Sequence, residues 1–116
     1  MSKERVMRAL KGLGISNIDT QVYVLLAKDG PHEIREIALA LNQHKRDIHR
    51  SLKNLQSINI VKASIEYPLE FMAVPFEEVI NLLIEIKKEK AKTLKASKED
   101  LLSSWRSITE KEDEKS

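Results

Sequence analysis

A cluster of basic side chains in the middle of the sequence is the segment best suited to chemistry. Between Gln43 and Lys62 the chain carries five basic residues and a single acid, Asp47. The basic residues are Lys45, Arg46, Arg50, Lys53 and Lys62. A guanidinium fork can bind guanine O6 and N7 or a phosphate with two hydrogen bonds, and an ammonium group pairs with phosphate as a point charge. These residue types indicate a polyanionic partner, while the alternative is a helix face that is only solvated.

The three histidines raise the question of a metal site. His44 and His49 are five residues apart in the sequence, which places them about 140° apart around a helix. His32 lies on a different predicted element, and the chain has no cysteine. We therefore expect no metal site and no other cofactor. A pH-sensitive contact to nucleic acid through His49 stays open as another use of that side chain.

The sequence contains no recognisable catalytic arrangement. It has no Gly-rich phosphate loop, no Gly-x-Ser-x-Gly elbow and no His-Glu-x-x-His zinc motif. Carboxylates such as Glu77, Glu78 and Glu85 share a predicted helix with many lysines, which is the usual pattern of a solvated helix face. We predict no catalytic residues, and we do not expect the protein to be an enzyme.

The elements that must position the basic cluster are indicated by apolar spacing and by capping signals. One helix is predicted over residues 2–11, with Ser2 as its N-cap. A second helix begins after Ser16, which can cap its free N–H groups, and ends at Gly30-Pro31. A third helix, over residues 33–41, has one apolar face. The side chains predicted on the inner faces of the second and third helices are Val22, Leu25, Leu26, Ile34, Ile37, Ala38 and Leu41.

The basic residues fall on the next predicted helix, over residues 45–57, after a turn at Asn42-Gln43. Ile48, Leu52 and Leu55 form its predicted inner face, with the small Ser51 beside them. The basic side chains are left on the opposite side. This helix is therefore predicted to have an apolar back and a polybasic front.

Two strands complete the predicted domain. Residues 58–63 are rich in β-branched residues, residues 69–74 are the predicted return strand, and Tyr67-Pro68 marks a hairpin turn between them. A helix, a turn, a basic helix and two strands in this order are typical of a winged helix-turn-helix. The predicted fold is mainly α with a small β-hairpin, and the winged helix-turn-helix domain covers residues 1–75.

The winged helix-turn-helix commonly places its second helix in the major groove of DNA. We therefore predict double-stranded DNA as the partner. The predicted contact residues are His44, Lys45, Arg46, His49, Arg50 and Lys53. Arg46 or Arg50 is suited to guanine, whereas Lys45 and Lys53 are suited to phosphates. The competing interpretation is a winged-helix adaptor that binds other proteins and makes no direct contact with DNA.

Residues 76–116 are predicted as a second region, one long helix with a frayed acidic tail from Glu110. Residues 76–109 contain no Gly or Pro, and a helix of that length would measure about 51 Å. The side chains predicted to face a second copy are Leu83, Ile86, Leu94, Leu101, Trp105 and Ile108. Leu83, Leu94 and Trp105 are spaced by eleven residues, which favours a nearly straight pair of helices. We predict a homodimer; docking on another protein and binding of an acidic surface by the lysines are the alternatives.

The ordered set of short motifs resembles the N-terminal DNA-binding domain of the TrmB-like family of archaeal transcription regulators. The motifs are Leu13-Gly14-Ile15-Ser16, Val22-Tyr23, Leu25-Leu26, Gly30-Pro31, Leu52-Lys53-Asn54-Leu55, Ile60-Val61 and Ala73-Val74-Pro75-Phe76-Glu77-Glu78. The resemblance covers about residues 10 to 85. It implies a winged helix that dimerises and binds operator DNA.

The sequence departs from that family pattern at three places. Asn42 stands where a glycine is common in the turn, and asparagine also tolerates left-handed geometry. His49 replaces a usual tyrosine. The wing carries Glu66 and Glu70 where relatives are commonly rich in Arg and Lys, so we expect readout of DNA to be dominated by the helix. No sugar response is carried over, because the chain ends after one helix beyond the winged domain.

Composition narrows the remaining choices. At 116 residues the chain fits one domain, and its net charge of +2 is concentrated in the basic cluster rather than spread evenly. Only 4% of the residues are aromatic, which disfavours stacking of single-stranded nucleic acid. The absence of cysteine excludes disulfides. No apolar run approaches the length of a bilayer span and no signal peptide is visible, so a cytoplasmic location is expected.

Overall fold

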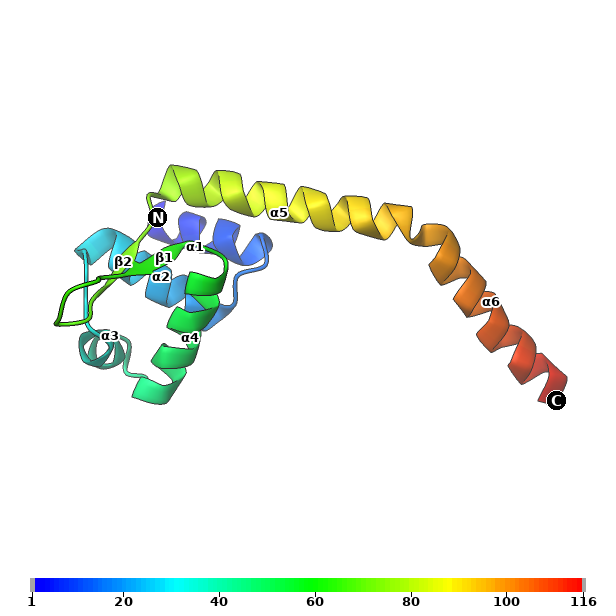
Figure 1. The fold of residues 1–116 in the computed structure, drawn as a ribbon, viewed down its shortest axis with the longest axis horizontal. Coiled ribbons are helices and arrows are strands. Elements are labelled where there is room, and N and C mark those ends of the chain that lie inside the picture. The colour runs from blue at the N-terminus through cyan, green and yellow to red at the C-terminus, as the bar shows by residue number, and fades with distance from the viewer. Residues whose placement is uncertain (1, 116) are drawn as a thin grey trace. The chain divides into compact units, whose positions relative to one another are not determined.

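The computed structural model describes the backbone of residues 2–115 and the side chains of residues 2–110. It consists of two compact units, Met1–Leu83 and Ile84–Ser116 (Figure 1). The elements are α1 (Ser2–Gly12), α2 (Asn17–Asp29), α3 (Ile34–Leu41), α4 (Lys45–Ser57), β1 (Val61–Ala63), β2 (Phe71–Ala73), α5 (Phe76–Ala96) and α6 (Lys98–Lys115). This order confirms the predicted winged helix-turn-helix arrangement in the first unit.

The central element of the first unit is α2, which packs against α1, α3, α4 and β2. Val22 and Leu26 are buried as predicted, whereas Leu25 is only partly covered. In α3, Ile37 and Ala38 are buried, while Ile34 and Leu41 keep part of their surface exposed. The predicted inner face of α4 is confirmed, because Ile48, Ser51, Leu52 and Leu55 are all buried. The core is therefore assembled from apolar faces that the helical spacing indicated.

Local capping signals set most of the helix ends. The Ser16 hydroxyl accepts a hydrogen bond from the Asp19 N–H at 3.2 Å, which confirms Ser16 as the N-cap of α2. Gly30 ends the same helix with a φ of 89°, and its N–H donates to the Leu26 carbonyl. At α3 the Glu33 and Glu36 side chains form a capping box with each other's backbone N–H groups. One predicted cap is wrong: Ser2 is already the first residue of α1 rather than its N-cap.

The sheet is smaller than predicted, and it has an extra partner. β1 and β2 pair antiparallel, with Lys62 opposite Met72. The predicted first strand began at residue 58, but Ile58 still caps α4 and Asn59 adopts a left-handed φ of 63°, so pairing begins only at Val61. The segment before α3 joins the sheet through a bridge between His32 and Phe71, whose N–H groups each donate to the other's carbonyl, at 3.2 and 2.8 Å. The bridge ties the entry of α3 to the hairpin.

In the second unit the predicted single helix is interrupted at Ser97, between α5 and α6 (Figure 1). The Ser97 hydroxyl donates to the Thr93 carbonyl at 2.8 Å, and the Thr93 hydroxyl donates to the Glu89 carbonyl at 3.0 Å. Such back-bonding to the carbonyl four residues earlier weakens and bends helices, and it is found here at an interruption that contains neither Gly nor Pro. The helix α6 extends to Lys115. The side chains of the predicted acidic tail beyond Glu110 lie outside the described residues.

Candidate nucleic-acid interface

The side chains predicted to contact DNA lie on the outer face of α4 and at its N-cap. His44, the N-cap residue of α4, makes no side-chain capping bond and is exposed. The five helical members of the set are also exposed, namely Lys45, Arg46, His49, Arg50 and Lys53. The opposite face is closed, because Ile48 and Leu55 are both 0% exposed. The apolar side of α4 therefore anchors it to the core, and its basic side is free for a partner.

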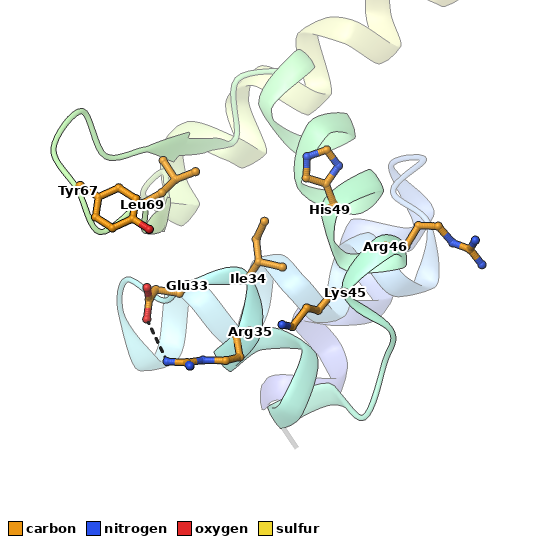
Figure 2. Close-up of a pocket in the computed structure, with 8 residues that line it drawn as sticks. All are labelled: Glu33, Ile34, Arg35, Lys45, Arg46, His49, Tyr67 and Leu69. Carbon is orange, nitrogen blue, oxygen red and sulfur yellow. Dashed lines mark ion pairs between the residues drawn. The ribbon is translucent and has the colours of Figure 1, made fainter.

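The basic face of α4 has two flanks. At about 100° per residue, Lys45 and His49 lie within about 40° of each other, and Arg46 and Arg50 form a second pair about 100° further round. Figure 2 shows the Lys45 side chain extending toward the start of α3, while the Arg46 guanidinium points away from α3 and the hairpin. The two flanks can therefore contact different parts of one ligand.

A groove of about 550 Å³ lies beside the first flank (Figure 2). Its lining residues come from the start of α3, from α4 and from the loop of the hairpin. They are Glu33, Ile34, Arg35, Lys45, Arg46, His49, Tyr67 and Leu69. The side chains of Ile34, Tyr67 and Leu69 supply its apolar part. The cationic lining residues come from α3 and α4, and Glu33 is the acid among the lining residues.

The charges at the entry of α3 are only loosely held. The Arg35 guanidinium lies 3.8 Å from the Glu33 carboxylate, and the Arg35 side chain is 69% exposed. An exposed pair of this kind contributes roughly 0–1 kcal/mol to stability. The Glu33 carboxylate also accepts a backbone N–H in the capping box of α3. Arg35 can consequently turn to another anion at little cost, while Glu33 stays engaged by its own helix.

The hairpin loop is closed by Ser64. Its N–H donates to the Glu70 carbonyl at 2.8 Å, and its hydroxyl accepts the Glu70 N–H at 2.9 Å. The same hydroxyl lies 3.1 Å from the Glu66 carbonyl and 3.2 Å from the Pro68 carbonyl, which offers its proton two acceptors. These bonds shape the loop that presents Tyr67 and Leu69 to the groove.

A family model described as the sugar-specific transcriptional regulator TrmB matches residues 10–77 of this chain. The chain belongs to the TrmB family. The uncharacterized protein MJ1503 of Methanocaldococcus jannaschii is 30% identical over 94 residues, covering 76% of this chain and 71% of that protein. The matched residues of this TrmB-family chain include α2, α3, α4 and the hairpin, so the family assignment confirms the resemblance seen in the sequence.

Solved structures confirm the winged-helix fold of this TrmB-family member. A possible transcriptional regulator of Methanosarcina mazei is similar with a TM-score of 0.64 and 16% identity, covering 84% of this chain and 86% of that one. The transcriptional regulator Tm0710 of Thermotoga maritima gives 0.57 and 21%, covering 92% and 85%. A point mutant of MepR from Staphylococcus aureus, bound to an oligodeoxyribonucleotide, gives 0.54 and 18%, covering 98% and 89%.

Behind the interface, Tyr23 joins α2 to the end of the hairpin. Its hydroxyl donates to the Val74 carbonyl at 2.6 Å, and the side chain is 1% exposed. Burial raises the pKa of Tyr23 to about 12, because the phenolate would lose its hydration. The family motif Val22-Tyr23 thus has a structural role in this chain, as a buried link between α2 and the strand that leads into α5.

The geometry also bears on the alternatives to DNA binding. Within the described part of the chain, no group of three or more His, Cys, Asp or Glu side chains could hold a metal ion. The Nδ1 atom of His32 lies 2.7 Å from the Gly30 carbonyl oxygen. His32 precedes α3, so it belongs to a different segment from His44 and His49. None of the helices in the described residues is long and apolar enough to cross a membrane.

The groove contains residues that were not predicted to contact DNA. Ile34 was predicted only as a core residue, Arg35 received no role, and the hairpin loop was expected to contribute little. One signal was available, because the loop contains three apolar residues, Ile65, Tyr67 and Leu69. Ile65 and Tyr67 are essentially fully exposed, at 102% and 95%.

Proposed function

We propose that this TrmB-family protein is a sequence-specific DNA-binding transcription regulator that inserts α4 into the major groove and acts as a homodimer. The observation that carries the proposal is the two-sided character of α4, with buried apolar residues behind and exposed basic residues in front. Family membership supports a role in transcription, and the similar MepR structure is described as bound to an oligodeoxyribonucleotide. The proposed binding of DNA is also consistent with a cytoplasmic location of the protein.

The contact set on α4 divides by side-chain chemistry and direction. Arg46 and Arg50 share the flank that faces away from the hairpin, and each can donate two hydrogen bonds to guanine. Lys53 lies between the flanks and is suited to a phosphate, as is His44 at the N-cap. We therefore assign sequence readout to the two arginines and affinity to the remaining members of the set.

The decisive variant replaces Arg46 and Arg50 with alanine. Both side chains are exposed, so the fold should be unchanged while preference for the selected duplex over random duplex is lost, at about 1–3 kcal/mol for each good guanine contact. The measurement is fluorescence anisotropy with a duplex recovered from a random pool. A matched control is the Arg5→Ala, Arg8→Ala protein, which loses the same charge from exposed positions of α1. Equal specificity of the two double variants would refute the assignment to Arg46 and Arg50.

A winged-helix adaptor without DNA binding is the competing function. The two are separated by the salt dependence of binding to random duplex DNA. Each phosphate contact contributes about 0.9 to the slope of the logarithm of affinity against the logarithm of salt concentration. The proposed regulator should therefore lose affinity steeply as salt rises, whereas an adaptor should bind weakly at every salt concentration.

The homodimer is supported by apolar residues of the second unit. Leu94, Leu101, Trp105 and Ile108 are each more than half exposed, and Ile86 is partly exposed. Leu83 is only 3% exposed and belongs to the first unit, so we leave it out of the proposed interface. A twofold dimer also suits DNA, since two recognition helices can then contact half-sites about 34 Å apart.

A further inference from the structure

We propose that the two copies of the homodimer pair antiparallel through the second unit, with Leu101 of one copy against Leu101 of the other. In this register the partner's Trp105 packs over the break at Ser97, and Leu94 lies opposite the partner's Ile108. The inference rests on the proposed homodimer and deepens it, because it specifies the orientation and the register of the pair.

The apolar stripe of the second unit is symmetric about its own midpoint. Ser97 and Trp105 stand four residues before and after Leu101. Leu94 and Ile108 stand seven residues before and after it. Steps of three and four residues keep all five positions on one face of a helix. A twofold axis through the midpoint of an antiparallel pair matches each position with the one at equal distance on the other side, so this stripe is complementary to a second copy of itself.

The backbone keeps these positions in one helical phase across the break. The Ser97 N–H donates to the Thr93 carbonyl at 3.0 Å, and the Leu101 N–H donates to the Ser97 carbonyl at 2.9 Å. Both bonds have the spacing of four residues that defines an α-helix. The end of α5 and the start of α6 can therefore present one common stripe to a partner.

The positions that meet in this register are matched in size and polarity. Trp105 is 61% exposed, and the small side chain of Ser97 leaves room for its indole. The Ser97 hydroxyl already donates to the Thr93 carbonyl at 2.8 Å, so covering it leaves no unpaired donor. At the other levels of the pair, aliphatic side chains that are each more than half exposed cover one another, and burial of such surface drives association.

Lysines along the helix select this register among its neighbours. Displacement of the pair by one helical turn in either direction would place Ile108 opposite Lys98 or Lys90, and covering an ammonium group with an aliphatic side chain is unfavourable. In the proposed register the level of Lys90 is matched by position 112, which is a glutamate in the sequence. Opposite charges thus fall at both ends of the stripe. A parallel pair in register would instead bring Lys90 to the level of its own copy.

The chain has no native cysteine, so single cysteines in the full chain can report which positions meet. A disulfide requires Cα atoms within about 7 Å of each other. We expect Leu101→Cys to form a disulfide-linked dimer on mild oxidation, detected by non-reducing electrophoresis. Leu94→Cys and Ile108→Cys should stay unlinked when oxidised separately, because each lies about 21 Å along the axis from its own copy. A mixture of these two variants should give a linked dimer after exchange of subunits.

Lys92→Cys is the matched control, because it is exposed and lies nine residues before Leu101, about 180° around the helix. It should stay unlinked. Linkage of Leu94→Cys and of Ile108→Cys each on its own would overturn the antiparallel orientation. A dimer in which Leu101→Cys stays unlinked would overturn the register. Sedimentation of the natural chain as a monomer would instead overturn the proposed homodimer itself.

An exchange of side chains tests the contact between Trp105 and Ser97 without cysteine chemistry. Ser97→Trp should bring two indoles together at each of these contacts and raise the dissociation constant of the dimer roughly tenfold, because overpacked contacts are destabilising. Combining Ser97→Trp with Trp105→Ser should restore association, since a large and a small side chain again face each other. Sedimentation equilibrium measures both constants, and a double variant that associates no more tightly than Ser97→Trp would contradict the contact.

Discussion

Tyr23 is the side chain that most directly links the helical core to the hairpin. Its hydroxyl donates to the Val74 carbonyl at 2.6 Å, and Val74 in turn donates its N–H to the Ile60 carbonyl at 3.0 Å. Tyr23→Phe would keep the ring and leave the buried Val74 carbonyl without this partner. We expect the free energy of unfolding to fall by about 1–3 kcal/mol, measured by urea denaturation at neutral pH. Tyr67→Phe, at an exposed position, is the control and should be neutral.

The pKa of Tyr23 adds a pH dependence to this prediction. Its folded value of about 12 lies above the ordinary 10.0, so the contribution to stability is fully present below pH 10. As pH rises from 10 to 12, the unfolded state loses the proton first, and the advantage of the natural protein over Tyr23→Phe should decline. Urea denaturation of both proteins across this range measures the difference. An advantage that stays constant up to pH 12 would show that Tyr23 titrates normally.

The turn between α3 and α4 is the element that aims the recognition helix. Asn42 occupies it with φ 52° and ψ 50°, and the Gln43 N–H donates to the Ala38 carbonyl at 3.0 Å, as in a Schellman motif. A left-handed backbone costs an ordinary L-residue roughly 1–2 kcal/mol. We therefore expect Asn42→Ala to lower the free energy of unfolding by about 1 kcal/mol and Asn42→Gly to be neutral or stabilising.

Asn54 provides the opposite case in the same protein. It is exposed within α4, where alanine is the better helix former and glycine costs about 1 kcal/mol relative to alanine. The order of stability should thus be glycine above alanine at position 42 and alanine above glycine at position 54. Urea midpoints of the four variants, at one protein concentration, test both orders. The same order at both positions would mean that the turn does not require left-handed geometry.

Elements whose signals are local were predictable from the sequence. Ser16 and Gly30 mark the two ends of α2. Both ends were predictable because hydroxyl capping and a positive φ depend only on neighbours a few residues away. The two faces of α4 followed from spacing alone, since a buried stripe and a basic stripe repeat with the helical period. Position 42 was also recognisable, because asparagine tolerates the conformation that a glycine would take there.

Elements that depend on distant partners were not predictable. The bridge between His32 and Phe71 joins β2 to a segment that precedes α3. The sequence around His32 does not indicate a strand. The groove draws Ile34, Tyr67 and Leu69 from two elements and a loop, so no single sequence window contains it. The break at Ser97 is an intermediate case. Thr93 and Ser97 are spaced for back-bonding, yet serine and threonine also occur in uninterrupted helices.

At the scale of the whole molecule, the second unit carries exposed apolar side chains. Leu101, Trp105 and Ile108 follow the spacing of one helix face within α6, and each is more than half exposed. A contiguous exposed apolar surface of this kind is typical of an interaction site. Between Ile86 and Leu94 the helix α5 carries mainly lysines and other polar residues, so it has no comparable apolar stripe there. We therefore place the proposed contact between two copies mainly on α6 and the end of α5.

Trp105 reports on this contact because it is the single tryptophan of the chain. In a dimer its indole should be covered, so emission should shift to longer wavelength on dilution as the copies separate. Leu101→Lys should give the monomer emission at every concentration and sediment as a monomer, while Leu39→Lys, at an exposed position of α3, should behave like the natural protein. Leu101→Lys should also lose affinity for a duplex with two half-sites but keep its affinity for a single half-site, because each winged domain still folds around its own core. A Leu101→Lys protein that remains dimeric would place the interface between copies elsewhere, and an equal loss of affinity on both duplexes would show that the substitution acts through the winged domain rather than through pairing.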